Sequence, residues 1–150
     1  MFYLSAIIVL FLDQLIKLFI AANFFPGQSI PIINKVLYLT YVQNKGAAFG
    51  ILSGFEIFLL AVGFIAVAII FYFHSNFKAR DFIQLPLGLI LGGSFGNIID
   101  RFLRHYVVDY IDFRVWPVFN LADCMINIGV ALLLWYWFFA GENKNASPSS

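Results

Sequence analysis

The chain has few charged residues and almost no cysteine. Charged side chains make up 11% of its 150 residues, less than half of the roughly 25% usual in soluble domains. The net charge is only +1, so there is no electrostatic basis for a nucleic-acid partner. The single cysteine, Cys124, forms no internal disulfide and supplies no zinc site alone. A disulfide framework and a nucleic-acid-binding domain are therefore excluded.

Apolar residues are correspondingly abundant. They account for 62% of the chain, against roughly 45–50% in soluble proteins. A domain of this size buries only about 70% of the surface of its unfolded chain, so such an excess cannot be hidden in a core. The composition excludes a soluble monomer and a disordered chain. It indicates a small integral membrane protein.

Four stretches are long and apolar enough to cross a hydrocarbon layer of ~30 Å as helices of about 20 residues. They are residues 1–22, 57–73, 82–99 and 124–141. We predict an all-α membrane protein with four transmembrane helices in a single domain, followed by a polar tail at residues 142–150. The first stretch lacks a basic n-region and carries Asp13 and Lys17. We therefore interpret it as a retained span and not as a signal peptide.

Four antiparallel spans place both termini and the turn at residues 74–81 on one side of the membrane. Lys78 and Arg80 in this short turn favour cytoplasmic termini, although a plain count of basic residues on the other side favours the reverse. The loop at residues 23–54 lies on the opposite side. Its residues 30–42 are rich in β-branched and aromatic side chains and end in a turn signal, which predicts a small extracytoplasmic β-sheet at the membrane surface.

Charged residues within spans need a partner or a function, because each costs roughly 2.5–3.5 kcal/mol at mid-depth. Asp13 and Lys17 lie four residues apart on one helix face. We interpret them as an internal ion pair that locks the first helix to its neighbours. In the third span, Gly88, Gly92 and Gly96 recur every four residues, which predicts a face that another helix approaches closely.

Further polar residues gather on the side of the membrane that carries the first loop. They are Asn97, Asp100 and Arg101 at the end of the third span, Asp109 and Asp112 after it, and Asn120, Asp123 and Asn127 along the fourth span. Two carboxylates in a partly apolar site cannot both ionise cheaply, so one holds its proton near neutral pH. This is the arrangement of an acid–base pair that activates water without a metal.

The same acids allow two other interpretations. In a transporter, Asp13, Asp109 and Asp123 would form a cation or proton relay, although no inverted repeat is visible. A hard-metal site would use three acids and a histidine, namely Asp100, His105, Asp109 and Asp112. Arg101 and Arg104 would oppose a cation there. Helix capping also explains Asn120 and Asp123, but it does not explain Asn127 deeper in the span.

Five motifs occur in order along the chain: DQLIK at residues 13–17, NKGAAFG at 44–50, GNIIDR at 96–101, VVDYIDF at 107–113 and FNLAD at 119–123. With them the sequence resembles the bacterial lipoprotein signal peptidase family (signal peptidase II) over residues 1–141. The resemblance implies an aspartic endopeptidase of the bacterial cytoplasmic membrane. Such enzymes remove the signal peptide of a prolipoprotein just before its diacylglyceryl-modified cysteine.

The resemblance also implies roles for individual residues. Asp109 and Asp123 match the catalytic pair. Positions that bind substrate or orient this pair are matched by Asn44, Asn97, Arg101 and Asn120. We interpret Asp13, Lys17 and Asp100 as structural polar residues. We expect no metal or other cofactor, a monomer in contact with membrane lipid, and an active site on the extracytoplasmic face.

Overall fold

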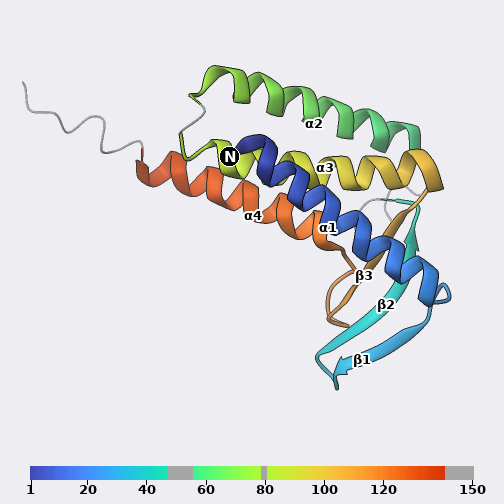
Figure 1. The fold of residues 1–150 in the computed structure, drawn as a ribbon. Coiled ribbons are helices and arrows are strands. Elements are labelled where there is room, and N and C mark those ends of the chain that lie inside the picture. The colour runs from blue at the N-terminus through green and yellow to red at the C-terminus, as the bar shows by residue number, and fades with distance from the viewer. Residues whose placement is uncertain (47–55, 79–80, 141–150) are drawn as a thin grey trace, which may run out of the picture.

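The computed structural model of the protein describes residues 1–46, 56–78 and 81–140. Four long helices dominate this part of the chain (Figure 1). They are α1 (Phe2–Asn23), α2 (Glu56–Asn76), α3 (Gln84–Arg104) and α4 (Leu121–Trp135), and α4 continues as a π-helical turn, η2 (Tyr136–Ala140). Each predicted span contains a helix, although α4 begins at Leu121 and not at residue 124. The predicted tail, Arg80 and residues 47–50 of the first-loop motif lie outside the described residues.

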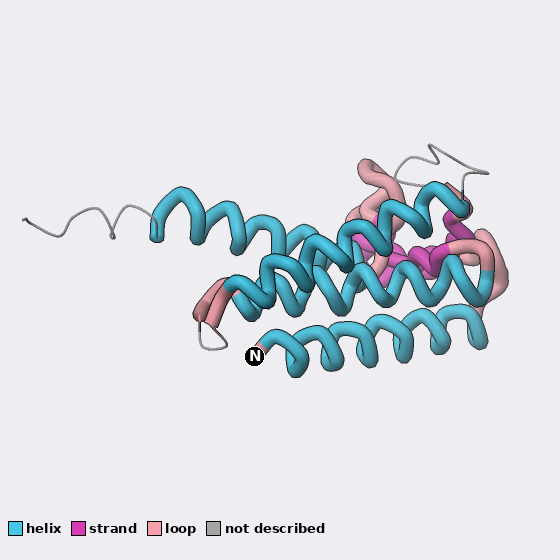
Figure 2. Tube along the Cα trace, turned by 90° about the horizontal axis from the view of Figure 1, so that it is seen from above, coloured by secondary structure: helices cyan, strands magenta, loops and turns pink. Residues whose placement is uncertain are grey.

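The helix α3 lies at the centre of the bundle and packs against α1, α2 and α4 (Figures 1 and 2). Two adjacent glycines allow this packing on two sides. A Cβ atom on Gly92 would lie 2.5 Å from the carbonyl oxygen of Ala6 in α1, and one on Gly93 would lie 2.6 Å from that of Ala122 in α4. Both distances are shorter than van der Waals contact. The predicted close approach of helices along the glycines of α3 is therefore confirmed.

The outer surfaces of the helices are apolar, and the charges of α1 lie inside the bundle. Leu4, Ile7 and Phe11 are more than half exposed, whereas Asp13 and Lys17 are fully buried. This pattern suits a helix bundle that lipid surrounds. Within the described residues, the helices long and apolar enough to cross a membrane cover Phe2–Asn23, Ile57–Asn76 and Leu121–Phe138. The glycine-rich and more polar α3 does not meet this criterion, so four spans remain a prediction.

The first loop forms two strands, β1 (Ser29–Ile33) and β2 (Leu37–Asn44), as the sequence predicted. A third strand, β3 (Val107–Asp112), pairs antiparallel with β2 and completes the sheet in the order β1-β2-β3. The sequence did not predict this strand. Nearly every residue of β3 is buried, so the alternation of apolar and polar residues that marks a half-buried strand is absent.

A small apolar cluster joins the sheet to the bundle. Tyr41 of β2 and Val108 and Tyr110 of β3 pack against Ile20, near the end of α1. The sheet therefore lies where α1 and α3 end and α4 begins (Figure 1). This junction brings β3 close to the first turn of α4, and the predicted site residues lie there. Its position relative to the bilayer remains a prediction.

Candidate active site

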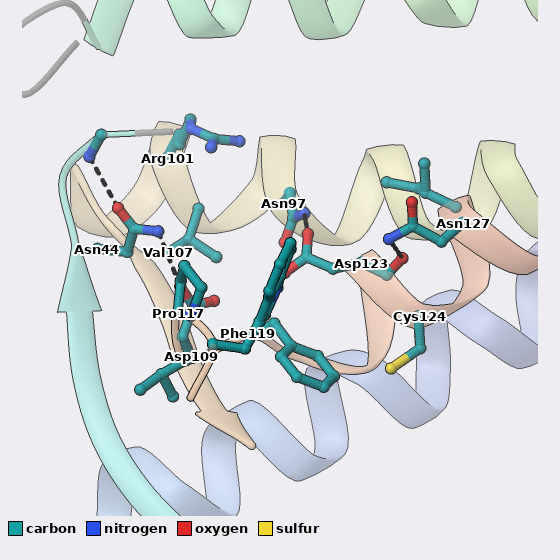
Figure 3. A pocket seen from close by; sticks show the side chains of 14 residues that line it. Asn44, Asn97, Arg101, Val107, Asp109, Pro117, Phe119, Asp123, Cys124 and Asn127 are labelled. Carbon is teal, nitrogen blue, oxygen red and sulfur yellow. Dashed lines mark hydrogen bonds between the residues drawn. The ribbon is translucent and has the colours of Figure 1, made fainter. Parts of the chain in front are cut away.

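A pocket of about 430 Å³ opens at the junction of the sheet and the bundle (Figure 3). Its lining includes most of the predicted site residues, namely Asn44, Asn97, Arg101, Asp109 and Asp123. They come from the end of β2, the last turns of α3, the middle of β3 and the first turn of α4. The fold therefore brings together five residues that span 80 positions of the sequence, from 44 to 123.

The Asp109 carboxylate is held from both sides by amides. Its side chain is almost completely buried in β3. Asn44, the last residue of β2, donates a hydrogen bond from Nδ2 to Asp109 Oδ2 at 2.8 Å. Asn120, which precedes α4, donates from its Nδ2 to Asp109 Oδ1 at 2.6 Å. Each carboxylate oxygen therefore accepts one hydrogen bond, and the orientation of the group is set by three segments of the chain.

Asp123 is fixed by the start of α4. Asn120 and Asp123 form a capping box: Asp123 N–H donates to Asn120 Oδ1 at 3.0 Å, and Asn120 N–H donates to Asp123 Oδ2 at 3.2 Å. From α3, Asn97 Nδ2 donates to Asp123 Oδ1 at 2.8 Å. The cap interpretation of these residues is confirmed. It does not exclude a catalytic role, because the same carboxylate lines the pocket.

Asn120 links the two acids. Its Oδ1 accepts from Asp123 N–H, so its Nδ2 faces Asp109. The same Nδ2 lies 3.2 Å from Oδ1 of Asn97, the residue that donates to Asp123. Asn120 itself is completely buried. Two asparagines thus hold the Asp109 and Asp123 carboxylates in one connected network at the pocket wall.

A buried cluster of charges supports this network from behind. The Lys17 ammonium lies 2.9 Å from Asp13 Oδ2, 3.2 Å from Asp100 Oδ2 and 2.9 Å from Asn97 Oδ1. These three acceptors match the three hydrogens of an ammonium group. All three charged side chains of the cluster are fully buried. Because Lys17 donates to the oxygen of Asn97, the nitrogen of that amide must point toward Asp123.

The two acids of the cluster also bind main-chain groups of the elements that carry the pocket acids. Asp13 Oδ1 accepts from Ala122 N–H in α4 at 3.0 Å. Asp100 Oδ2 accepts from Val108 N–H in β3 at 3.0 Å. Ala122 precedes Asp123, and Val108 precedes Asp109. The cluster therefore ties α1 and α3 to both segments that position the Asp109 and Asp123 side chains.

Burial raises the pKa of Asp109 to about 7. Loss of solvation is the largest cause, because an ionised carboxylate is poorly stabilised away from water. The negative charge of Asp123 raises the pKa further, whereas the hydrogen bonds from Asn44 and Asn120 lower it. Asp109 is therefore partly protonated at neutral pH, where an ordinary aspartate is ionised. A carboxylic acid beside a second carboxylate can act as an acid while its neighbour acts as a base.

The adjacent residues Asp100 and Arg101 face different surroundings. Asp100 points into the buried cluster, and Arg104 Nε lies 3.6 Å from its Oδ1. Arg101 lines the pocket (Figure 3). Neighbouring residues on a helix point about 100° apart, so Asp100 faces the buried cluster while Arg101 faces the pocket. The guanidinium of Arg101 brings a fork of hydrogen-bond donors to the side of the pocket near the sheet.

The residues of the alternative metal site are not brought together. Asp112 accepts from Thr40 Oγ1 at 2.7 Å and from Arg114 N–H at 2.8 Å, on the sheet and away from the pocket lining. Asp100 belongs to the Lys17 cluster. Across residues 1–46, 56–78 and 81–140, no three His, Cys, Asp or Glu side chains lie close enough to share an ion. The alternative metal site of Asp100, His105, Asp109 and Asp112 is therefore wrong, because the fold does not bring these side chains together.

Comparison with known proteins identifies the family. The family described as "Signal peptidase (SPase) II" matches residues 5–139. The chain belongs to the signal peptidase II family. This confirms the resemblance drawn from the five motifs, and membership makes the chain a peptidase. Relatives named "Lipoprotein signal peptidase" include one from Halothermothrix orenii that is 46% identical over 136 residues, covering 91% of this chain and 94% of the relative. Another, from Moorella thermoacetica, is 42% identical over 148 residues and covers 98% and 99%.

Two solved structures share the fold of this signal peptidase II family member. One, described as "Bacterial membrane enzyme structure by the in meso method at 2.3 A resolution", has a TM-score of 0.87 and 34% sequence identity. That match covers 98% of this chain and 93% of the other. The second, described in the same words at 1.9 Å, has a TM-score of 0.79 and 35% identity over 91% of each chain. The fold is therefore that of a bacterial membrane enzyme.

The pocket of this signal peptidase II family member also contains residues that the sequence did not indicate. Trp116, Pro117 and Val118, between β3 and α4, line it together with Cys124. Pro117 and Cys124 line the pocket together with Phe119 (Figure 3). The run VWPVF lacks the Gly, Ser and Asn of an ordinary surface loop, which was the available signal. Asn127, noted in the sequence as unexplained, lines the pocket as well.

Proposed function

We propose that the protein is a membrane aspartic endopeptidase that removes the signal peptide of prolipoproteins on the amino-terminal side of a diacylglyceryl-modified cysteine. Family membership supports the reaction and the substrate class. One observation carries the mechanism. Two carboxylates, from β3 and α4, line one pocket, and Asn120 binds both: its side-chain nitrogen donates to Asp109 and its main-chain N–H donates to Asp123.

In the proposed mechanism Asp109 begins as the acid and Asp123 as the base. The raised pKa of Asp109 supports its assignment as the protonated partner. Asp123 lies in the first turn of α4, where the helix dipole stabilises a negative charge. It is also less buried than Asp109, so it meets water more readily. The buried surroundings of Asp109 favour its protonated form, and the helix start at Asp123 favours a charged carboxylate, as an acid–base pair requires.

The chemistry transfers two protons. Asp123 takes a proton from water as the water oxygen attacks the scissile carbonyl carbon. Asp109 donates a hydrogen bond to the developing oxyanion and then gives its proton to the leaving amine as the C–N bond breaks. After the products leave, a proton moves from Asp123 to Asp109, and the starting state is restored.

The other pocket residues are assigned to substrate binding and orientation. Asn44, Asn97 and Asn120 orient the two acids through the hydrogen bonds already described. Arg101 binds a substrate carbonyl with its guanidinium, since it lines the pocket. Asp13, Lys17 and Asp100 keep a structural role.

The proposed setting is the bacterial cytoplasmic membrane, with four spans, cytoplasmic termini and the pocket at the extracytoplasmic face. The apolar outer surface of the helices supports contact with lipid. A substrate whose own apolar helix lies in the bilayer would meet a pocket at the end of the bundle, beside the first turn of α4. We propose that the chain works as a monomer and needs no cofactor.

Cleavage of a lipidated prolipoprotein by the purified protein in detergent tests this function. A matched substrate without the diacylglyceryl group and a reaction with a chelator serve as comparisons. We expect one new amino terminus at the lipidated cysteine, slower cleavage of the unlipidated substrate, and unchanged turnover with the chelator. Cleavage at other sites would contradict the proposed specificity. Loss under chelation that a divalent ion restores would contradict the two-aspartate mechanism.

A further inference from the structure

Asn127 is a polar side chain in the apolar part of α4 that the catalytic network does not use. From Met125 to Trp135, no other residue of this helix carries a carboxamide, a hydroxyl or a charge. An amide facing lipid is costly, because hydrocarbon offers it no hydrogen-bond partner. Yet the Asn127 side chain is exposed. It therefore needs an explanation.

The contacts of Asn127 leave most of its hydrogen-bonding capacity open. Its Nδ2 donates to the main-chain oxygen of Asp123 at 2.9 Å, one turn earlier in α4. That bond uses one of two amide hydrogens. Oδ1 accepts no hydrogen bond from the described residues, and the side chain lines the same pocket as Asp109 and Asp123 (Figure 3). The pocket thus contains an unused acceptor and an unused donor on one side chain.

The depth of Asn127 matches the side from which a membrane-embedded substrate arrives. Asn127 lies four residues after Asp123, which is about 6 Å further along the helix axis. From Asp123 the helix α4 leads away from the sheet through apolar residues (Figure 1). In the proposed membrane setting, Asn127 is therefore on the bilayer side of the two acids. A signal peptide that spans the bilayer would pass this position before it reaches them.

Cleavage requires hydrogen-bond partners for the substrate main chain at this depth. A peptide bond inside a regular helix is shielded by neighbouring turns and by side chains, so the segment beside it must unwind to expose its carbonyl carbon to water. Unwinding releases main-chain N–H and C=O groups from their helical hydrogen bonds. In an apolar environment each unpaired group costs several kcal/mol. A carboxamide with one free acceptor and one free donor can pair with one released group of each kind.

We infer that Asn127 is a substrate-binding residue whose carboxamide pairs with the main chain of the unwound signal-peptide segment, amino-terminal to the scissile bond. This inference rests on the proposed function, because it takes a helical, membrane-embedded peptide as the substrate. It deepens that function by assigning a subsite for the peptide backbone on the bilayer side of the catalytic pair. The subsite recognises no particular side chain, so it suits signal peptides of varied sequence.

Two variants test the inference with a lipidated prolipoprotein. Asn127→Leu removes the carboxamide at similar volume and should lower kcat/KM about tenfold, the usual cost of leaving buried polar groups unpaired. The double variant Asn127→Ile with Ile128→Asn keeps the composition but turns the amide about 100° around the helix, to a position outside the pocket lining. It should be as slow as Asn127→Leu. Thermal unfolding of Asn127→Leu should match that of the unaltered protein.

Full kcat/KM in Asn127→Leu would overturn the inference, and so would recovery of activity in the double variant. Lipopeptides in which one amide before the scissile bond is replaced by an ester lack one N–H each. One such ester should slow the unaltered protein and have no further effect on Asn127→Leu. Equal losses in both proteins at every position would also overturn it. Failure of the unaltered protein to cleave the parent lipopeptide would instead contradict the proposed function itself.

Discussion

The side-chain nitrogen of Asn120 lies 2.6 Å from Oδ1 of Asp109. This one contact joins the residue that caps α4 to a buried acid in the middle of β3. Because Asn120 also accepts the main-chain N–H of Asp123, one side chain both caps α4 and binds the acid of β3. The helix cap and the pocket therefore share Asn120.

Gly96 has no room for a side chain beside the buried charges. A Cβ atom at this position would overlap Oδ2 of Asp13. We predict that Gly96→Ala lowers the free energy of unfolding by about 1–3 kcal/mol, because the carboxylate must move away from Lys17. Gly63→Ala is the matched control. There a Cβ atom meets the apolar side chain of Ile98, with Cγ1 2.9 Å away, and displaces no buried charge, so its cost should be smaller. Equal thermal unfolding of the two variants would contradict this account.

Lys17 is completely buried and lies between two buried acids, Asp13 and Asp100. We predict that Lys17→Met destabilises the protein by roughly 3–5 kcal/mol, since it leaves Asp13 and Asp100 without their counter-charge. Adding Asp13→Asn should recover part of this loss. Lys78→Met changes an exposed lysine and should have little effect. A Lys17→Met protein as stable as Lys78→Met would contradict the proposed structural role of the cluster.

Turnover should decrease as pH rises through about 7. Burial and the charge of Asp123 raise the pKa of Asp109 to about 7, and above that pH no proton is available for the leaving amine. The measurement is kcat against pH with a lipidated prolipoprotein. A turnover that is constant from pH 6 to pH 9 would contradict the assignment of Asp109 as the acid.

The free energy of unfolding should also decrease as pH rises. The folded state keeps the Asp109 proton up to about pH 7, whereas an unfolded aspartate releases it near 3.8. The contribution of this group to stability is therefore lost as pH rises through that interval, by on the order of 4 kcal/mol at most. Thermal unfolding of Asp109→Asn should lack this decrease. The same pH slope in the variant and in the unaltered protein would show that Asp109 is not buried as described.

Much of the helical architecture follows from the sequence because each span is a long apolar run. The hydrogen-bond partners of the site residues cannot be predicted in this way. Asn44 reaches Asp109 only because β2 and β3 pair in the register that sets Val42 opposite Asp109 and Asn44 opposite Val107. A strand that is buried on both faces shows no alternation, so neither β3 nor this register was predictable from its pattern.

The buried cluster illustrates the same limit. Helix geometry predicts that Asp13 and Lys17 share a face, since they lie one turn apart. It does not predict that Lys17 also donates to Asn97, 80 residues later. That contact depends on how closely α1 approaches α3, and so on the glycines between them. Local spacing thus identified the charged residues, whereas tertiary packing decided which groups they bind.

Asp112 provides the matched control for the proposed catalytic pair, because it is a buried acid of the same strand as Asp109. It binds Thr40 and Arg114 on the sheet and does not line the pocket. We predict that Asp112→Asn keeps turnover within about tenfold of the unaltered protein, or roughly 1.4 kcal/mol of activation free energy. A much larger loss would reopen the question of which acids form the pair.

The most direct test is the turnover of Asp109→Asn and Asp123→Asn on a lipidated prolipoprotein, with Asp112→Asn measured beside them. Each of the first two substitutions should reduce kcat by at least about 10³, which is roughly 4 kcal/mol of activation free energy, in a protein that still unfolds cooperatively. Turnover within tenfold of the unaltered protein in either variant would contradict the two-aspartate mechanism.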